Sequence, residues 1–272
     1  MQTKLSDKQI DFYRENGFLV IDDFLTAQEL EAWRDALDEA VLQQVVQNET
    51  HNQNRDSYNY YKNVFIQCVN LWKTNEKIRN LTLDPQLGKL GTDLAGTTGM
   101  CLFHDHALIK QPWANPTNFH IDNPSDPYHT RQSIMVWVTL DDATLQNGCL
   151  YFLPGTHKTS RFDRSGELGR EGVGLIFDEY PEWVEINPYA AEMKAGSCAF
   201  INGMVAHAAG PNMTPHPRRA FSMLLMPERA TFNGQQSVLP DELFKRLKVG
   251  DVLEDDDEHL PLLFSYHSRN SA

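Results

Sequence analysis

The hydrophobic pattern of this chain changes its period near residue 98. Before that point apolar residues recur at helical spacing, and the run from Leu30 to Val41 predicts an amphipathic helix over residues 27–46. After it, short β-type runs alternate with turn residues such as Asn147-Gly148 and Pro154-Gly155. Helices followed by many short strands predict a mainly β protein with α elements, a jelly roll with N-terminal helices packed outside. The expected strands are 100–109, 133–140, 149–153, 184–186, 198–201 and 221–226.

The first 97 residues carry clear boundary signals. Ser6 with Gln9, and Thr26 with Glu29, have the spacing of capping boxes at two helix starts. Residues 18–24 are expected to form a strand. Residues 74–95 predict a helical pair broken at Asp84-Pro85, and the polar residues 48–60 predict a surface loop.

Length and cysteine usage set the domain prediction. A chain of 272 residues can bury a full core without disulfides or structural metal. We expect one domain over 1–272, with a helix-rich part at 1–97, a jelly-roll core at 98–230 and a C-terminal extension at 231–272. The four cysteines form no C-x-x-C pair and are interpreted as buried thiols in a reducing compartment. With no apolar leader at the N-terminus, we expect the cytoplasm.

The net charge of the chain limits the classes of molecule that it is expected to bind. Lys plus Arg is 24 and Asp plus Glu is 37, which gives a formal net charge of −13. No basic stripe is visible, so nucleic acid is not an expected partner. No apolar run approaches the roughly 20 residues of a membrane helix, so no membrane association is expected. A polyanionic substrate would need a local basic pocket.

Several common catalytic motifs are absent from the sequence. Gly91 and Gly96 have the spacing of a phosphate-binding loop, but Thr97 stands where the lysine would be. The sequence contains neither G-x-S-x-G nor G-x-G-x-x-G. Nucleotide-binding and serine-hydrolase functions are therefore not favoured.

One set of polar residues has the composition of an iron site. His120 and Asp122 lie two apart, and alternate residues of an extended chain face the same side. His207 lies 87 residues after His120, and Arg218 opens the last strong β-run. Two histidines and one carboxylate form the facial triad of non-haem Fe(II) oxygenases, and an arginine suits the distal carboxylate of 2-oxoglutarate. The spacing alone also allows a core histidine at 207 and a surface pair at 120 and 122.

Four stretches of the chain resemble the phytanoyl-CoA dioxygenase family of Fe(II)/2-oxoglutarate oxygenases. The most specific is the block Asn-Gly-Cys-Leu-Tyr-Phe-Leu-Pro-Gly-Thr-His-Lys at 147–158, and the whole set is 12–25, 119–122, 136–158 and 196–220. The resemblance covers most of the chain. It implies a double-stranded β-helix, the cupin-like jelly roll.

The resemblance also assigns roles to residues. It implies that Fe(II) binds to His120, Asp122 and His207. Arg218 matches the residue that binds the distal carboxylate of 2-oxoglutarate, and strand alternation would turn Arg219 to the opposite face. Trp137 matches an aromatic beside the cosubstrate, and Lys110 a lysine near it. Two departures, Ile121 in place of a frequent Gln and Ala209 in place of Ser, leave Arg218 with more of the cosubstrate binding.

The implied reaction uses O₂ to convert 2-oxoglutarate into succinate and CO₂ while a small organic molecule is hydroxylated. Relatives that halogenate carry a small residue at the position of Asp122, so its carboxylate favours hydroxylation. Desaturation and cyclisation are left open, as is the oligomeric state.

Two other functions are compatible with the residues. His104 and His106 form an H-x-H pair like that of cupins, which would suit a cupin-like metal-dependent isomerase, although no glutamate follows before Glu167. The chain could also be a non-catalytic jelly-roll binding module. Formation of succinate from 2-oxoglutarate separates an oxygenase from both.

The substrate pocket is the least specified part of the prediction. We expect its wall to include Phe119, Tyr128, Trp137 and residues from 58–72, with His104 and His106 at its mouth or acting on the substrate. Residues 155–174 have loop composition and are either a lid or a solvated excursion between strands.

Overall fold

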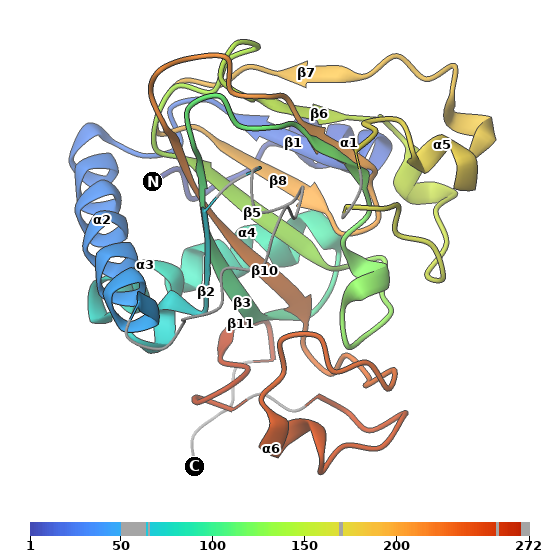
Figure 1. The fold of residues 1–272 in the computed structure, drawn as a ribbon. Helices are drawn as coiled ribbons and strands as arrows, with labels where there is room; N and C mark the ends of the chain where they lie inside the picture. The colour runs from blue at the N-terminus through green and yellow to red at the C-terminus, as the bar shows by residue number, and fades with distance from the viewer. Residues whose placement is uncertain (50–63, 65, 169–170, 254–255, 268–272) are drawn as a thin grey trace.

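The computed structural model describes residues 1–49, 64, 66–168, 171–253 and 256–267, and Figure 1 shows their fold. The helices are α1 (Asp7–Asn16), α2 (Ala27–Glu49), α3 (Glu76–Thr82), α4 (Pro85–Ala95), α5 (Ile176–Glu179) and α6 (Asp241–Phe244), with 3-10 turns η2 (Leu71–Lys73), η3 (Asn123–Ser125), η4 (Thr156–Lys158) and η5 (Pro181–Trp183). The strands are β1 (Phe18–Ile21), β2 (Ile66–Val69), β3 (Gly99–Lys110), β4 (Thr117–His120), β5 (Ile134–Thr139), β6 (Leu150–Phe152), β7 (Tyr189–Ala191), β8 (Cys198–Asn202), β9 (His207–Ala209), β10 (Arg218–Pro227) and β11 (Leu262–Ser265).

These strands form two antiparallel sheets. The larger has the order β1-β8-β5-β10-β3-β11, with β2 also paired to β3, and the smaller has the order β4-β9-β6-β7. Neighbours in both sheets are distant in sequence, so the chain passes repeatedly from one sheet to the other. This arrangement confirms the expected jelly roll.

The inner faces of the two sheets share a core. Phe18 of the large sheet stacks on Phe152 of the small sheet, with ring centroids 4.3 Å apart. Around them lie Trp137, Leu150 and Ile201, all buried. Residues that alternate with these along the strands face the helices instead.

The N-terminal helices cover the outer face of the large sheet. Trp33 and Leu37 of α2, with Leu90 of α4, pack against sheet residues such as Phe200 and Phe221. Figure 1 shows α2 and α3 along one side of this sheet. The Ser6 and Gln9 side chains form the predicted capping box. The helical pair at 74–95 is confirmed, and the Asp84 side chain accepts a hydrogen bond from the Gln86 N–H at the start of α4.

Two local predictions were wrong. Residues 184–186 form no strand: Trp183 stacks on Tyr180 in η5, and Ile186 N–H closes a turn onto the Trp183 carbonyl. Helix α2 continues to Glu49, past the predicted loop start at 48, while the rest of that loop lies outside the described residues.

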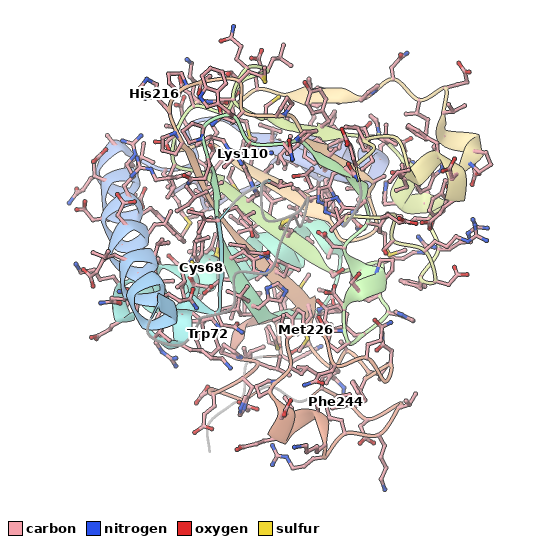
Figure 2. The ribbon with its side chains drawn as sticks, viewed as in Figure 1. Cys68, Trp72, Lys110, His216, Met226 and Phe244 are labelled. Carbon is pink, nitrogen blue, oxygen red and sulfur yellow. The ribbon has the colours of Figure 1, made fainter. Side chains whose placement is uncertain are left out.

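The C-terminal residues pack against the jelly roll. Phe232 bridges to Tyr128, and the Asn233 side chain donates to the Asp126 carbonyl. Figure 2 places Phe244 at this end of the molecule, next to the end of the large sheet marked by Met226. Among the described helices, none combines the length and apolar character needed to cross a bilayer.

Candidate active site

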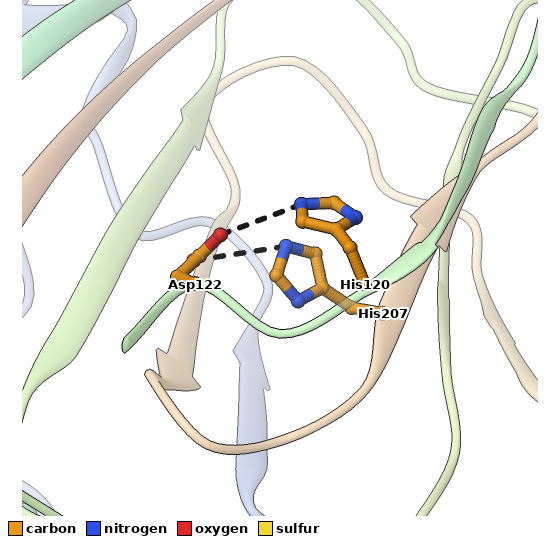
Figure 3. A group of neighbouring side chains, drawn as sticks. All are labelled: His120, Asp122 and His207. Atoms are coloured by element: carbon orange, nitrogen blue, oxygen red, sulfur yellow. Dashed lines mark ion pairs between the residues drawn. The ribbon is translucent and has the colours of Figure 1, made fainter. Parts of the chain in front are cut away.

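The pairing of β4 with β9 brings together two histidines that are far apart in sequence. His120 and His207 are register partners in the small sheet, and their ring centroids lie 4.2 Å apart. Asp122 follows directly after β4. Its Oδ1 is 3.4 Å from His120 Nε2, and its Oδ2 is 3.8 Å from His207 Nε2 (Figure 3).

Backbone contacts fix the orientation of both imidazoles. His120 Nδ1 is 2.9 Å from the Asn118 carbonyl, and His207 Nδ1 is 3.2 Å from the Val205 carbonyl. A carbonyl only accepts, so each Nδ1 is an N–H donor and each Nε2 is the nitrogen left for a metal. Both Nε2 atoms face Asp122, which is the orientation that a metal requires of its histidine ligands.

The charge states also suit a metal. Burial opposes the charge on Asp122, but the neighbouring His207 and the hydrogen bond with His120 outweigh it and lower the pKa of Asp122 to about 2. Burial lowers the pKa of His207 to about 4, with the charge of His120 as a smaller cause. For His120 burial acts in the same direction, but the hydrogen bond and charge of Asp122 raise its pKa. Metal binding therefore competes with protonation of His120.

The donor set fits iron. Within the described part of the chain, His120, Asp122 and His207 are the one group of three metal-ligating side chains whose ligand atoms lie within 4.8 Å of one another. Among the residues that the structure describes, none gives the buried Oδ2 of Asp122 a hydrogen bond. Two imidazole nitrogens and one carboxylate oxygen on one side of a metal leave the other side open for a cosubstrate.

Arg218 provides a site for a carboxylate near this group. It is the first residue of β10, is 2% exposed, and has buried Nε and Nη1 groups without a hydrogen-bond partner. Burial lowers its pKa to about 10, so the guanidinium remains charged at neutral pH. A buried cation with free donors is costly unless an anion pairs with it. A bound carboxylate such as that of 2-oxoglutarate meets this requirement.

Trp137 and Lys110 both lie next to Arg218. The Trp137 ring centroid is 5.1 Å from the Arg218 guanidinium carbon, and Trp137 lines the same cavity. Lys110 is the register partner of Arg218 on β3, but it is fully buried and its ammonium donates to the Asn115 carbonyl at 2.8 Å. Figure 2 shows Lys110 at the end of the large sheet where β10 begins. Lys110 is not among the described lining residues, so the geometry does not support its predicted contact with the cosubstrate.

The triad and Arg218 line one cavity of about 410 Å³, a size typical of small-molecule sites. His104 and His106 line it, and their strand also contributes Leu108. Phe119 and Tyr128, which were also expected in the wall, are not among the described lining residues. Phe119 packs into the core cluster around Trp183, and Tyr128 into the core between the sheets.

Sequence reasoning missed one part of the wall and gave another only as a range. Gln67 and Val69 of β2 fall within the predicted range 58–72 but were not singled out, and residues 58–63 and 65 lie outside the described residues. Ser237 and Val238 come from the C-terminal extension, which carries no motif. Their position follows from the bond between the Gln235 side chain and the Pro124 carbonyl, close after Asp122.

The loop at 155–174 is bonded along the strand that carries His120. Ile121 N–H donates to the Ser165 carbonyl at 2.9 Å, and Phe119 N–H to the Val173 carbonyl at 3.1 Å. Ser165, Gly166 and Leu168 then face the cavity. The loop is therefore a wall of the site and a support for the ligand strand rather than a solvated excursion.

Comparison with known proteins gives the family. The model of the family described as Phytanoyl-CoA dioxygenase (PhyH) matches residues 13–220. A phytanoyl-CoA dioxygenase of Arabidopsis thaliana is 26% identical over 252 residues, which cover 80% of this chain and 88% of that protein. Methylphosphonate hydroxylase of Gimesia maris is 24% identical over 219 residues, which cover 80% of each chain.

Solved structures of similar fold include two from nogalamycin biosynthesis. The non-heme alpha-ketoglutarate-dependent carbocyclase SnoK superposes with a TM-score of 0.78 at 25% identity, covering 96% of this chain and 97% of its own. The epimerase SnoN, solved with Fe3+, alpha-ketoglutarate and nogalamycin RO, has a TM-score of 0.72 at 23% identity, covering 95% and 98%. Together with the iron-type triad and the family match, this places the chain in the phytanoyl-CoA dioxygenase family, as an Fe(II)- and 2-oxoglutarate-dependent oxygenase.

Proposed function

We propose that this protein hydroxylates a small organic molecule. His120, Asp122 and His207 bind Fe(II), and Arg218 binds the distal carboxylate of 2-oxoglutarate with Trp137 beside it. One observation carries this proposal: a metal site and a carboxylate site share one cavity. The metal site is the group of His120, Asp122 and His207, and the carboxylate site is Arg218, whose Nε and Nη1 have no hydrogen-bond partner among the described residues.

Each of these residues has a separate task. When bound, iron with 2-oxoglutarate and O₂ supplies an oxidant strong enough to break a C–H bond, with succinate and CO₂ as co-products. The backbone carbonyls of Asn118 and Val205 keep both histidines oriented. Arg218, held against Trp137, orients the cosubstrate through a charge-assisted pair.

Hydroxylation is the favoured outcome because a carboxylate stands at position 122, where the resemblance associates halogenation with a small residue. Similar proteins named a carbocyclase and an epimerase show that other outcomes occur on this fold. The mass of the product separates them: hydroxylation adds one oxygen atom, ring closure removes two hydrogens, and epimerisation changes no mass.

We further propose that residues 1–272 act as one oxygenase domain in the cytoplasm. The cavity that contains the triad draws its wall from β2, from the jelly-roll strands and from the C-terminal extension, which supports one domain. Cys68, Cys149 and Cys198 are buried free thiols, which supports a reducing compartment.

A screen of succinate formation against a library of small molecules tests the proposal. The Fe(II)-loaded protein should convert 2-oxoglutarate faster with a substrate present, and mass spectrometry should find an oxygen added to that substrate. Iron- and 2-oxoglutarate-loaded protein that forms no succinate with any compound would contradict the oxygenase assignment. A product of unchanged mass would contradict hydroxylation but not the oxygenase assignment.

A further inference from the structure

We propose that His104 and His106 recognise a neutral hydrogen-bonding group, a hydroxyl or carbonyl, on a mainly apolar substrate that carries no phosphate or carboxylate inside the cavity. This rests on the proposed function, since it describes what the same cavity admits beside the cosubstrate. Neither histidine belongs to the triad of His120, Asp122 and His207.

The strand geometry turns both histidines into the cavity. His104, His106 and Leu108 alternate along β3 and all line the cavity, whereas Asp105 between them points the other way. The Asp105 carboxylate accepts the N–H groups of Leu71 and Trp72 at 2.7 and 2.8 Å, which fixes this register.

The two rings form one polar surface. Their centroids are 4.3 Å apart, and His104 is only 3% exposed. His104 Nδ1 is buried without a hydrogen-bond partner, which is costly for a polar atom unless a ligand or water satisfies it. Gln67 Nε2 lies 3.4 and 3.5 Å from the two ring nitrogens of His106, so a third polar group meets the pair from β2.

Much of the remaining wall is apolar. Apolar side chains from six different segments enclose the remaining space: Val69, Leu108, Met135, Leu168, Leu224 and Val238. An apolar cavity with one compact polar surface selects a ligand with an apolar body and a matching polar group. The imidazole and amide groups can donate to or accept from a hydroxyl or carbonyl.

The charges of the wall disfavour an anionic substrate. Of the lining residues that the structure describes, Arg218 alone carries a guanidinium or ammonium group, and the cosubstrate carboxylate uses it. Asp122 and Asp126 are the acidic lining residues. Fe(II) would bring two positive charges, and the Asp122 carboxylate and the carboxylate at the keto end of 2-oxoglutarate would offset both. A phosphate or carboxylate on the substrate would therefore be buried without an unpaired cation, which is unfavourable. The phosphates of a coenzyme A thioester would have to stay outside the cavity.

A matched ligand series tests this directly. Protein loaded with Fe(II) and 2-oxoglutarate is titrated anaerobically with 2-naphthol, naphthalene, 2-naphthoate and 2-naphthyl phosphate, and calorimetry gives each Kd. We expect 2-naphthol to bind at least about tenfold more tightly than either anion. His106→Leu should weaken 2-naphthol binding about tenfold, the size of one lost hydrogen bond to a buried partner, and leave naphthalene binding nearly unchanged.

Controls separate this inference from the proposed function. His104→Phe gives a second variant of similar volume in case His106→Leu fails to fold, and His216→Leu replaces an exposed histidine outside the cavity (Figure 2). Iron content and 2-oxoglutarate affinity are measured in every sample, and both should match wild type. Anions that bind as tightly as 2-naphthol, 2-naphthol that fails to bind, or histidine variants that bind it normally would each overturn the inference. Loss of iron or 2-oxoglutarate binding in the wild type would instead count against the proposed function.

Discussion

Arg218 and Arg219 are consecutive residues of β10 whose side chains lie on opposite faces of the large sheet. Arg218 is buried in the cavity beside Trp137. Arg219 points outward, where its Nε and Nη2 bond to the two carboxylate oxygens of Asp141 at 3.0 and 2.8 Å and its Nη1 bonds to Asp38 of α2. One arginine is therefore available for a ligand, while the other ties helix α2 to the sheet.

This difference predicts opposite effects of two alanine substitutions. Arg218→Ala should weaken 2-oxoglutarate binding far more than iron binding, because a buried carboxylate loses its charged partner. Such losses cost roughly 2–5 kcal/mol. That is about 30-fold to several thousand-fold in affinity. Arg219→Ala should change 2-oxoglutarate affinity little and lower stability instead. Anaerobic calorimetric titration into metal-loaded variants measures both, and a larger loss of affinity in Arg219→Ala would show that the cosubstrate site is assigned to the wrong face.

The triad predicts that iron binding depends on three side chains. Wild-type protein should bind one Fe(II) per chain, and His120→Ala or His207→Ala should lose it, because each removes one oriented Nε2 ligand. His216→Ala, which changes an exposed histidine, is the matched control and should keep its iron. Metal analysis after dialysis gives the occupancy. Full occupancy in both triad variants would contradict the ligand assignment.

Asp122→Gly tests the third ligand and the reaction outcome together. The substitution removes the carboxylate and should abolish hydroxylation, while it leaves a coordination position that a halide can enter. Product mass spectrometry in chloride and bromide buffers distinguishes hydroxylated from halogenated product. Hydroxylation at the wild-type rate would mean that Asp122 is not a ligand.

The loop that supports the ligand strand yields a prediction at Gly166. This residue has φ +78°, and a Cβ added to it would lie 2.8 Å from the Phe119 carbonyl oxygen and 3.4 Å from His120 Cα. Gly166→Ala must therefore displace either the loop or β4, and iron affinity should fall several-fold. Gly250 has φ +95° with nothing within 4 Å of the added Cβ, so Gly250→Ala shares the backbone strain of about 1–2 kcal/mol without the contact. Equal iron affinity in the two variants would refute a positioning role for Gly166.

The sequence predicted long elements well and short ones poorly. Strands β3, β5, β8 and β10 contain apolar runs bounded by turn residues and were found within a few positions of their ends. β9 is only His-Ala-Ala, and β4 is Thr-Asn-Phe-His, so neither has a propensity signal; their pairing with each other and with β6 makes them strands.

The strength of the local sequence signal also explains which residues of the site could be predicted. His120, Asp122, His207 and Arg218 could be found because metal and carboxylate binding demand particular residue types at recognisable spacing. Cavity walls make no such demand: Val238 and Leu168 are ordinary apolar residues of loops, and only tertiary packing brings them to the cavity. Phe119, expected in the cavity wall, packs in the core cluster around Trp183, because alternation along β4 turns it away from the face of His120.

The last prediction concerns the pH dependence of stability. Burial, and then the nearby charge of Arg218, lower the pKa of Lys110 from 10.5 to about 7. The unfolded chain therefore binds a proton at this side chain between about pH 7 and 10.5 that the folded chain does not hold. Stability rises with pH wherever the unfolded state binds more protons, so this lysine makes the protein less stable at pH 7 than at pH 10.

Replacing Lys110 by the uncharged Met should remove that dependence. Relative to wild type, Lys110→Met should be most favourable at pH 7, and its relative stability should decline as pH approaches 10, where the wild-type lysine is neutral when folded. Lys110→Arg keeps its charge over the whole range and should be destabilised throughout. Urea unfolding of the metal-free proteins at pH 7, 8, 9 and 10 measures the differences. A difference between wild type and Lys110→Met that is constant across these pH values would show that Lys110 is not held in a depressed-pKa environment.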